Sequence, residues 1–517
     1  MSRYNYSRRA SSRVAIGNVK VGDGEPVALQ SMTNTPTMDT EASVEQCRRL
    51  AEAGADIVRL TAQTPMHAAN LGKIREQLRA QGIDTPLVAD IHFNPAAAFT
   101  AAENVEKVRI NPGNFVDPGR TFVKLEYTDE EYAGELQRIS DKFTPLLDLC
   151  RKRGVALRIG VNHGSLSDRI MSRYGDTPAG MVESAMEFLR ICRREHFDNV
   201  VISIKASNVV VMTETVRLLV DAMNREGMAY PLHLGVTEAG DGEDARIKSA
   251  VGIGSLLADG IGDTIRVSLS EDPVNEIPVA RMLVKHIASR LDETVDGKEP
   301  EQVRKHEISG IPMVIGHDVD SVPSDVHNIN VSHPNALGKA RKALDEVPAG
   351  IPVSVTLTYP ADMSAEEVTL AASVDLGSLL LEQPLDYVSV IAPALDDNER
   401  SALALGILQA TRRRISKTEY IACPGCGRTL FDLQTTLARV KEATAGLKTL
   451  KIGVMGCIVN GPGEMADADY GYVGAGPGRV SIYRGKQCVI KNIPAEDALE
   501  ALIAIIKEDG KWSDEEE

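Results

Sequence analysis

The sequence is poor in aromatic residues, has no excess of basic charge and contains no long apolar run. Aromatic side chains make up 4% of its 517 residues, with a single Trp, so few surfaces exist on which nucleic-acid bases could stack. Acidic side chains outnumber basic ones and give a formal net charge of -16, which excludes a general nucleic-acid or anionic-membrane surface. We therefore predict neither a nucleic acid nor a membrane as a partner.

Targeting segments and a disulfide pattern are also missing. No stretch reaches the roughly eighteen consecutive apolar residues that a membrane-spanning helix needs, and the start, MSRYNYSRRASSR, lacks the apolar core of a secretory signal. The seven cysteines are an odd number without regular spacing, and three of them lie close together near the C-terminal end. These features favour a cytoplasmic location and a metal site over disulfide bridges.

The first part of the chain alternates apolar, β-branched runs with stretches of helical periodicity. Stretches 43–53, 179–194 and 214–225 show the helical spacing. Eight such βα repeats predict an α/β fold with a TIM-type (β/α)8 barrel. The predicted strands are 27–33, 56–61, 87–93, 107–111, 156–162, 200–206, 232–238 and 264–269.

Composition changes divide the rest of the chain. A charged connector follows residue 290, so we expect a barrel over 1–290, a small α/β insert over 291–405 and a C-terminal α+β domain over 406–517. In the insert, 351–358 and 387–391 have the character of strands and 365–381 that of a helix. The alternation over 480–489 predicts a strand, and the acidic DEEE end is expected to be solvated.

Basic residues end or interrupt the predicted barrel strands. Catalytic sites of such barrels lie at the carboxyl ends of the strands, so these side chains should converge on one mouth. Buried cations without partners are costly, and a polyanion of diphosphate size would stabilise them, although some can pair with carboxylates instead. The five cations are Arg59, Arg109, Arg158, Lys205 and Arg266.

Further polar residues lie at the same strand ends. Asn111, Asn162, His163 and Ser268 can bind phosphate or hydroxyl groups, or can simply be satisfied structural groups. Two carboxylates, Glu238 and Asp90, are candidates for proton transfer, with charge balance for the arginines as the alternative. His92 is expected to be packed.

The sharpest pattern is a group of cysteines in IACPGCGR and GCIVNGPGE. Cys423 and Cys426 form a C-x2-C pair, and Cys457 with Glu464 follows in the second motif. Three thiolates and one oxygen ligand fit a [4Fe-4S] cluster with one distinct iron, one cluster per chain. Structural zinc with Cys488 as fourth ligand stays an alternative, although alternation makes Cys488 a packed strand residue.

These motifs together resemble the 4-hydroxy-3-methylbut-2-enyl diphosphate synthase family, the iron-sulfur enzymes of the non-mevalonate isoprenoid pathway. The resemblance rests on VALQSMTNTPTMDT, ADIVRLT, ADIHF, VRINPGN, LRIGVNHGS, GIGDTIRVSLSEDP and the two cysteine motifs. It implies reductive opening and dehydration of 2-C-methyl-erythritol 2,4-cyclodiphosphate, with two electrons from reduced ferredoxin or flavodoxin. It also implies that the five cations, with Asn111, Asn162 and Ser268, surround the diphosphate, and that Glu238 lies near the reacting bonds.

The resemblance further implies a homodimer in which the cluster domain of one subunit closes over the barrel of the other. The insert departs from the short bacterial pattern and is too small for a full second barrel, so closure within one chain stays open. Two other functions remain as alternatives: a pterin-type transferase barrel, which leaves the cysteine motifs unexplained, and a non-catalytic iron-sulfur sensor, which leaves the cations unexplained.

Overall fold

The computed structural model describes residues 2–92, 94–117, 126–300, 310–458, 461–465 and 467–512, so the acidic DEEE end lies outside the described residues. The chain forms two compact units. The larger unit comprises Ala10–Gly240, Gly262–Pro278 and Thr418–Glu517, and the smaller unit comprises Met1–Arg9, Asp241–Ile261 and Val279–Lys417. None of the described helices combines the length and apolar character needed to cross a membrane.

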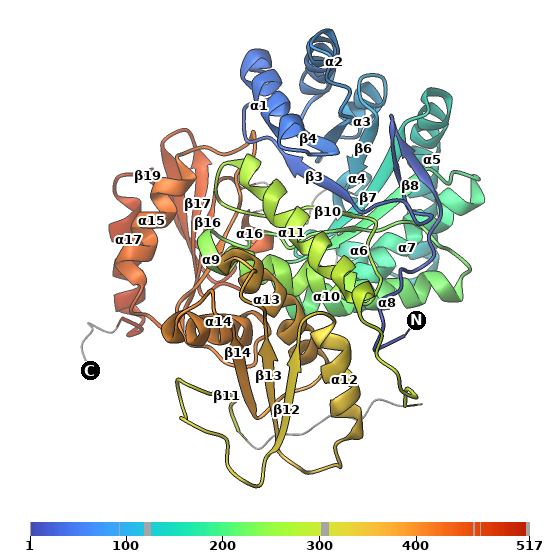
Figure 1. The fold of residues 1–517 in the computed structure, drawn as a ribbon. Coiled ribbons are helices and arrows are strands. Elements are labelled where there is room, and N and C mark those ends of the chain that lie inside the picture. The colour runs from blue at the N-terminus through green and yellow to red at the C-terminus, as the bar shows by residue number, and fades with distance from the viewer. Residues whose placement is uncertain are drawn as a thin grey trace. The chain divides into compact units, whose positions relative to one another are not determined.

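Eight parallel strands form a barrel in the larger unit (Figure 1). The strands run in the order β8-β7-β6-β5-β4-β3-β10-β9, and a parallel bridge between Ile202 and Leu232 joins the two ends of this order. Each predicted run contains one strand, so the (β/α)8 prediction is confirmed. The strands are β3 (Ala28–Met32), β4 (Ile57–Ala62), β5 (Leu87–Ile91), β6 (Lys107–Ile110), β7 (Ala156–Asn162), β8 (Val200–Lys205), β9 (His233–Leu234) and β10 (Thr264–Ile265).

Most of the barrel helices begin where a side-chain oxygen caps them, and α3 is an exception. Thr64 and Thr177, for example, accept hydrogen bonds from the amides of His67 and Gly180, and a proline follows each cap at a position where no amide hydrogen is needed. The three helical stretches predicted in this region are confirmed within α1, α7 and α8. The helices are α1 (Thr40–Glu52), α2 (Pro65–Ala80), α3 (Pro95–Ala102), α4 (Pro112–Phe115), α5 (Asp129–Arg153), α6 (Asp168–Tyr174), α7 (Pro178–Arg194) and α8 (Val209–Arg225).

An antiparallel hairpin of β1 (Val14–Ile16) and β2 (Val19–Val21) closes the amino-terminal end of the barrel. Its apolar side chains share one buried cluster with residues at the beginnings of the barrel strands. The lower end of the barrel is therefore apolar and filled, and the polar strand ends lie at the opposite mouth. The clustered strand residues are Ala28, Ile57, Val88, Ala156 and Val201.

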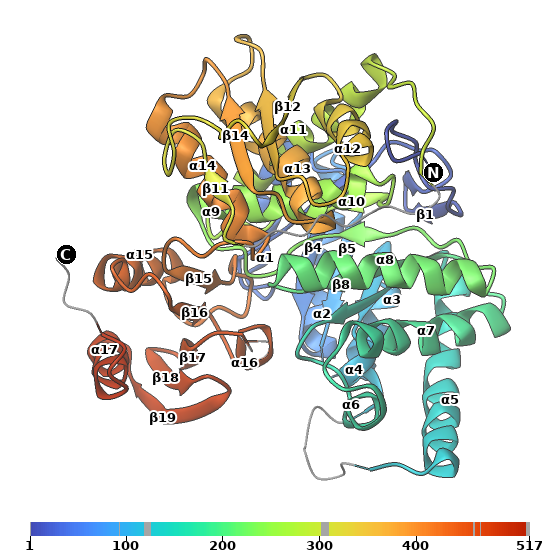
Figure 2. The same ribbon diagram turned by 90° about the horizontal axis from the view of Figure 1, so that it is seen from below.

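A five-stranded mixed sheet forms the C-terminal part of the larger unit (Figure 2). Alternation sends Ile452 and Val454 into one core with two helices, α15 and α17, while Met455 lies in a separate cluster. The predicted α+β character is confirmed, and the alternating stretch 480–489 is a hairpin that turns at Gly485. The elements are β15 (Glu419–Ala422), β16 (Lys451–Met455), β17 (Tyr470–Gly476), β18 (Arg479–Arg484), β19 (Gln487–Pro494), α15 (Leu433–Thr444), α16 (Gly461–Glu464) and α17 (Ala498–Glu508).

The smaller unit contains a parallel sheet in the order β11-β14-β13-β12, with one helix between β12 and β13 and one between β13 and β14. Within this unit, both strands and the helix that the sequence predicts between residues 351 and 391 are found, as β13, β14 and α13. The strands and helices are β11 (Met313–Val314), β12 (His327–Ser332), β13 (Val353–Thr358), β14 (Tyr387–Ile391), α9 (Gly242–Ser249), α10 (Ser255–Ala258), α11 (Glu276–Ser289), α12 (Ala336–Glu346), α13 (Ala365–Glu382) and α14 (Asp397–Ala410). Short π- or 3-10-helical turns are Ala250–Gly254, Pro273–Asn275 and Arg290–Asp292.

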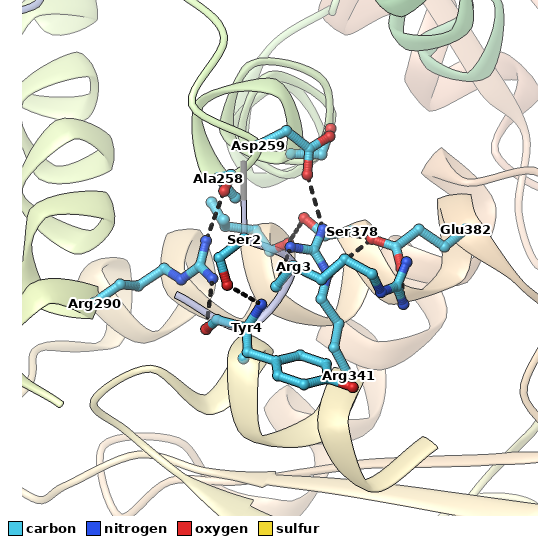
Figure 3. A network of polar contacts seen from close by, with 12 residues as sticks. Ser2, Arg3, Tyr4, Ala258, Asp259, Arg290, Arg341, Ser378 and Glu382 are labelled. Atoms are coloured by element: carbon cyan, nitrogen blue, oxygen red, sulfur yellow. Dashed lines mark hydrogen bonds and ion pairs between the residues drawn. The ribbon is translucent and has the colours of Figure 1, made fainter. Parts of the chain in front are cut away.

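Two buried arginines tie the N-terminal segment into the smaller unit (Figure 3). Arg341 donates to the carbonyl oxygen of Arg3 at 3.0 Å and to Asp259 Oδ1 at 2.9 Å. Arg290 donates to the carbonyl oxygen of Ala258 at 2.8 Å. Because these guanidinium groups satisfy backbone oxygens from separate segments, residues at the start of the chain belong to this unit's core.

Candidate active site

A cavity lies at the carboxyl ends of the barrel strands, where loops of the C-terminal sheet domain also line it. Both sides belong to the larger unit. Most of the residues predicted for the site line it together, although they are far apart in the sequence. These residues are Arg59, Asp90, Arg109, Arg158, Asn162, Lys205, Glu238, Arg266, Ser268, Cys423, Cys426, Cys457 and Glu464.

Asn111 and His163, two other predicted residues, are not among the cavity-lining residues. The Asn111 side chain caps α4 through the amide of Gly113 and donates to Ser165 Oγ at 2.9 Å. The His163 ring lies 3.4 Å from Asp176 Oδ1. Both follow barrel strands, but the structure turns them toward partners in loops.

Two of the predicted cations are paired with carboxylates. Arg266 donates two hydrogen bonds to the carboxylate of Glu276, from Nη2 at 2.9 Å and from Nε at 3.1 Å. Arg109 donates to Asp90 Oδ1 at 3.0 Å and to Asn162 Oδ1 at 3.1 Å. Their charges are therefore compensated within the protein.

Arg59, Arg158 and Lys205 have no carboxylate partner among the described residues. Arg59 donates only to the Met32 sulfur, at 2.8 and 3.0 Å, and two nitrogens of Arg158, Nε and Nη1, are buried without a hydrogen-bond partner. Burial, with the neighbouring arginines, lowers the pKa of Arg59 to about 10 and that of Arg158 and Lys205 well below the usual range. An anionic ligand in the cavity would therefore stabilise the charged forms of these three side chains.

Asp90 and His92 point into the barrel at successive inward positions, and their side chains differ in charge. Burial alone would raise the pKa of Asp90, but the charges of Arg109 and Arg59 hold it well below its ordinary value. Burial, with the charge of Arg428, lowers the pKa of His92 to about 3, although Asp90 opposes this shift. Asp90 is therefore a carboxylate and His92 a neutral imidazole at neutral pH.

Glu238 and Glu464 form a carboxyl pair at the top of the cavity. Burial and the nearby Glu464 raise the pKa of Glu238 well above its ordinary value. Glu238 has a left-handed backbone with φ of +50°, a conformation that costs free energy for a non-glycine residue and fixes where the side chain leaves the chain. Each carboxyl group has one buried oxygen, Oε2, without a hydrogen-bond partner, so both groups retain capacity for a ligand.

The three predicted cysteine ligands come from two loops of the C-terminal sheet domain. Cys423 and Cys426 follow β15, and Cys457 follows β16. The amide of Gly456 donates to Cys423 Sγ at 3.3 Å, and burial raises the pKa of this thiol to about 12. Cys488 lies on β19, does not line the cavity, and donates to the carbonyl oxygen of Ile490.

The chemistry of this donor set is compatible with an iron-sulfur cluster. Within the described ranges, no three His, Cys, Asp or Glu side chains are gathered closely enough to hold one metal ion. In a four-iron cluster each thiolate binds a different iron, so the sulfur atoms stand further apart than the ligands of one ion. Three thiols and the unpartnered Glu464 oxygen around one cavity are compatible with that arrangement.

Close backbone contacts fix the C-terminal sheet domain on the barrel mouth. A Cβ atom on Gly164, which has φ of +81°, would lie 2.2 Å from the carbonyl oxygen of Gly463, so no side chain fits there. Ser270 Oγ donates to the carbonyl oxygen of Cys423 at 2.8 Å, and Ser207 Oγ to that of Glu464 at 3.0 Å. Both segments that carry cysteine or glutamate ligands are thereby held by barrel residues.

The structure adds residues that the sequence interpretation did not select. Arg428, inside IACPGCGR, is buried at the mouth with Nη2 3.8 Å from Asp90 Oδ2. Glu276 is the partner of Arg266, and Met32 is the partner of Arg59. Arg428 could have been selected from the sequence, because it lies in the cysteine motif. Glu276 and Met32 could not, because only the fold brings them to the two arginines.

The fold and the site together define an α/β-barrel protein whose mouth is lined by basic side chains and by thiols of the C-terminal sheet domain. Residues 11–281 match the GcpE TIM-barrel domain, and residues 419–508 match the GcpE protein C-terminal domain. The chain belongs to the GcpE family.

Relatives match nearly the whole chain. Proteins from Parabacteroides distasonis and Phocaeicola vulgatus are 51% and 50% identical, each covering 99% of this chain and 100% of its own length, and one from Akkermansia muciniphila is 45% identical over 99% and 98%. All three are named 4-hydroxy-3-methylbut-2-en-1-yl diphosphate synthase (flavodoxin). Among solved structures, an N-acetylneuraminic acid synthetase from Leptospira borgpetersenii is similar over 56% of this chain and 93% of its own, with 13% identity and a TM-score of 0.36.

Proposed function

We propose that this chain is a 4-hydroxy-3-methylbut-2-en-1-yl diphosphate synthase. The reaction opens 2-C-methyl-D-erythritol 2,4-cyclodiphosphate and gives (E)-4-hydroxy-3-methylbut-2-enyl diphosphate and water. Two electrons and two protons enter, a ring carbon–oxygen bond and a carbon–hydroxyl bond break, and a carbon–carbon double bond forms. Relatives that match the chain from end to end and carry this name support the proposal.

The observation that carries the proposal is the shared cavity. Uncompensated cations from the barrel and three thiols from the C-terminal sheet domain line the same space. A pterin-type transferase does not account for the thiols, and a redox sensor does not account for the cations. The relatives' names favour neither of these alternatives.

The unpaired cations Arg59, Arg158 and Lys205 are proposed to bind the diphosphate. A buried guanidinium or amine without a carboxylate gains most from an anionic ligand, and its charge also stabilises the phosphate oxygen that departs when the ring opens. Asn162 and Ser268 line the same cavity and can donate hydrogen bonds to phosphate or hydroxyl oxygens.

We propose that Cys423, Cys426, Cys457 and Glu464 hold one [4Fe-4S] cluster. When bound, the cluster supplies electrons one at a time and a Lewis-acidic iron at the mouth. The unpartnered Oε2 of Glu464 supports its inclusion in this set.

Glu238 is proposed to hold a proton next to the reacting carbon–oxygen bonds. Its buried position beside Glu464 and its unpartnered oxygen are consistent with transfer of a proton to the departing hydroxyl group. Asp90 is ionised and paired with Arg109, so we propose that it orients this arginine toward the substrate.

Reduced flavodoxin or ferredoxin is the proposed electron donor, and the relatives' names favour flavodoxin. For the three ranges 1–290, 291–405 and 406–517, we propose a barrel that binds the cyclodiphosphate, a shortened middle domain and a cluster-binding domain. A homodimer stays a prediction.

The test is anaerobic purification followed by iron and sulfide analysis and turnover of the cyclodiphosphate with a reduced donor. We expect about four irons and four sulfides per chain and formation of the open-chain diphosphate. Cys457→Ser should lose both cluster and turnover. The matched control is Cys488→Ser, which changes the same residue type outside the cavity and should retain both. One zinc without sulfide, or full turnover of Cys457→Ser, would contradict the proposal.

A further inference from the structure

A buried lysine lies beneath the cavity and has no part in the proposed reaction. Lys107, on β6, has no solvent exposure, and its Nζ lies 3.3 Å from Gln30 Oε1 on β3. Strands β3 and β6 are separated by β4 and β5 in the sheet, so the contact crosses the interior of the barrel. The Lys107 side chain therefore points inward, one inward position below Arg109.

The residues paired with Lys107 on the two neighbouring strands are apolar. Its neighbours across the sheet are Val88 and Ala156, which belong to the cluster that packs on the β1–β2 hairpin. The hairpin fills the barrel from below, so water reaches this position only from the cavity side. A charged ammonium is poorly solvated in such a place.

Among the described residues, no carboxylate is paired with Lys107. The charged or titratable groups that face it are Arg59 from β4, Arg158 from β7 and His233 from β9, and the remaining polar contact is Gln30. Burial, with the charges of Arg158 and Arg59, lowers the pKa of Lys107 well below its ordinary value. Burial and the nearby cations also lower the pKa of His233, so this ring adds no positive charge at neutral pH.

We propose that Lys107 is an uncharged amine in the ligand-free protein and takes up a proton when a diphosphate group binds in the cavity above it. The proton comes from the solvent and adds to the amine lone pair, with no covalent change in the ligand. The negative charge of the ligand, acting through a poorly solvated interior, compensates the new ammonium. This inference rests on the proposed function, because it needs a diphosphate among Arg59 and Arg158.

Proton uptake gives the binding equilibrium a defined pH dependence. Because the complex holds one proton more than its separated components at this position, affinity falls as the pH rises. The positive charge of Lys107, below the cavity, would then be present only in the complex. The cavity would thereby avoid one uncompensated buried charge while it is empty.

The experiment is isothermal titration of the cluster-loaded protein with inorganic pyrophosphate, without reductant, in two buffers of different ionisation enthalpy. Wild type should take up about one proton more per bound pyrophosphate than Lys107→Met, since pyrophosphate's own titration is common to both proteins. Its affinity should also decrease with pH more steeply than that of the variant, by up to about tenfold per pH unit.

Two controls keep the outcome interpretable. Lys152→Met removes an exposed lysine of the barrel unit and should match wild type, and Lys107→Gln provides a second uncharged replacement if the methionine variant does not fold. Equal proton uptake by wild type and the Lys107 variants would overturn this inference while leaving the proposed function intact. Absence of pyrophosphate binding by wild type would overturn both.

Discussion

Asn162 donates a hydrogen bond from Nδ2 to the carboxylate of Glu464, although 302 positions separate the two residues in the chain. Asn162 ends barrel strand β7, and Glu464 ends α16 in the C-terminal sheet domain. The contact joins a residue proposed for the substrate to one proposed for the cluster. One chain therefore supplies both sides of the cavity.

Closure within one chain predicts that two defective variants do not rescue each other. We expect co-expressed Arg158→Met and Cys457→Ser chains to show no more turnover than the two separate variants, because each cavity contains one defect. The measurement is specific activity of the mixed preparation. Recovery of a substantial fraction of wild-type activity would instead indicate that the C-terminal domain of one chain completes the barrel of another.

Glu464→Gln should separate folding from activity. Gln keeps the size of the side chain and an oxygen that accepts from Asn162, so the thermal midpoint should stay close to that of wild type. Turnover should fall by about tenfold or more, because an amide is a poorer metal ligand than a carboxylate. Glu500→Gln, on the exposed side of α17, is the matched control. Unchanged turnover in Glu464→Gln would remove Glu464 from the ligand set.

Arg158→Met and Arg266→Met should change stability in opposite directions. Arg158 is buried without a carboxylate, so its replacement should raise the free energy of unfolding of the ligand-free protein by about 1–3 kcal/mol while weakening pyrophosphate binding. Arg266→Met leaves Glu276 buried and unpaired, and should lower the free energy of unfolding by about 3–5 kcal/mol. Chemical denaturation of both variants checks this, and equal losses in the two would contradict it.

His92 should make the protein less stable in mild acid. Its pKa is lowered from 6.5 to about 3 in the folded protein, so only the unfolded chain binds this proton between those values, and stability falls as the pH drops below 6.5. Between pH 7 and pH 5 the loss from this group is about 2 kcal/mol. Denaturation curves at both pH values should show a smaller loss for His92→Gln than for wild type.

The control for that experiment is His327→Gln, which replaces an exposed histidine on β12 and should keep the wild-type pH dependence. A loss in His92→Gln as large as that in wild type would show that His92 is not a buried neutral ring.

The sequence was sufficient to predict the barrel and those parts of the candidate site that depend on residues close together in the chain. β-Branched runs predict strands because such side chains fit a pleated, buried surface, and the C-x2-C spacing brings Cys423 and Cys426 onto one loop. The five cations were predictable because each interrupts or ends an apolar strand run, and the side chains of parallel barrel strands converge on one mouth.

The sequence could not predict which side chains form contacts with one another in the folded protein. Glu276 follows Arg266 by ten positions, yet nothing in that spacing shows that its carboxylate binds the guanidinium in two places. Asn111 and His163 follow strands as the other candidates do, but loop contacts decide which way such side chains turn. Lys107 escaped notice because it begins a strand, far from the end where barrel chemistry takes place.

The β1–β2 hairpin makes the barrel a blind-ended chamber. Since Val14, Ile16 and Val21 fill its lower end, traffic of ligand, water and protons takes place at the mouth that the C-terminal sheet domain covers. An open-chain product therefore leaves along the path by which the cyclic substrate entered. The close contact between Gly164 and Gly463 lies where the C-terminal sheet domain meets the barrel, so the two glycines line the one route that ligand and product share.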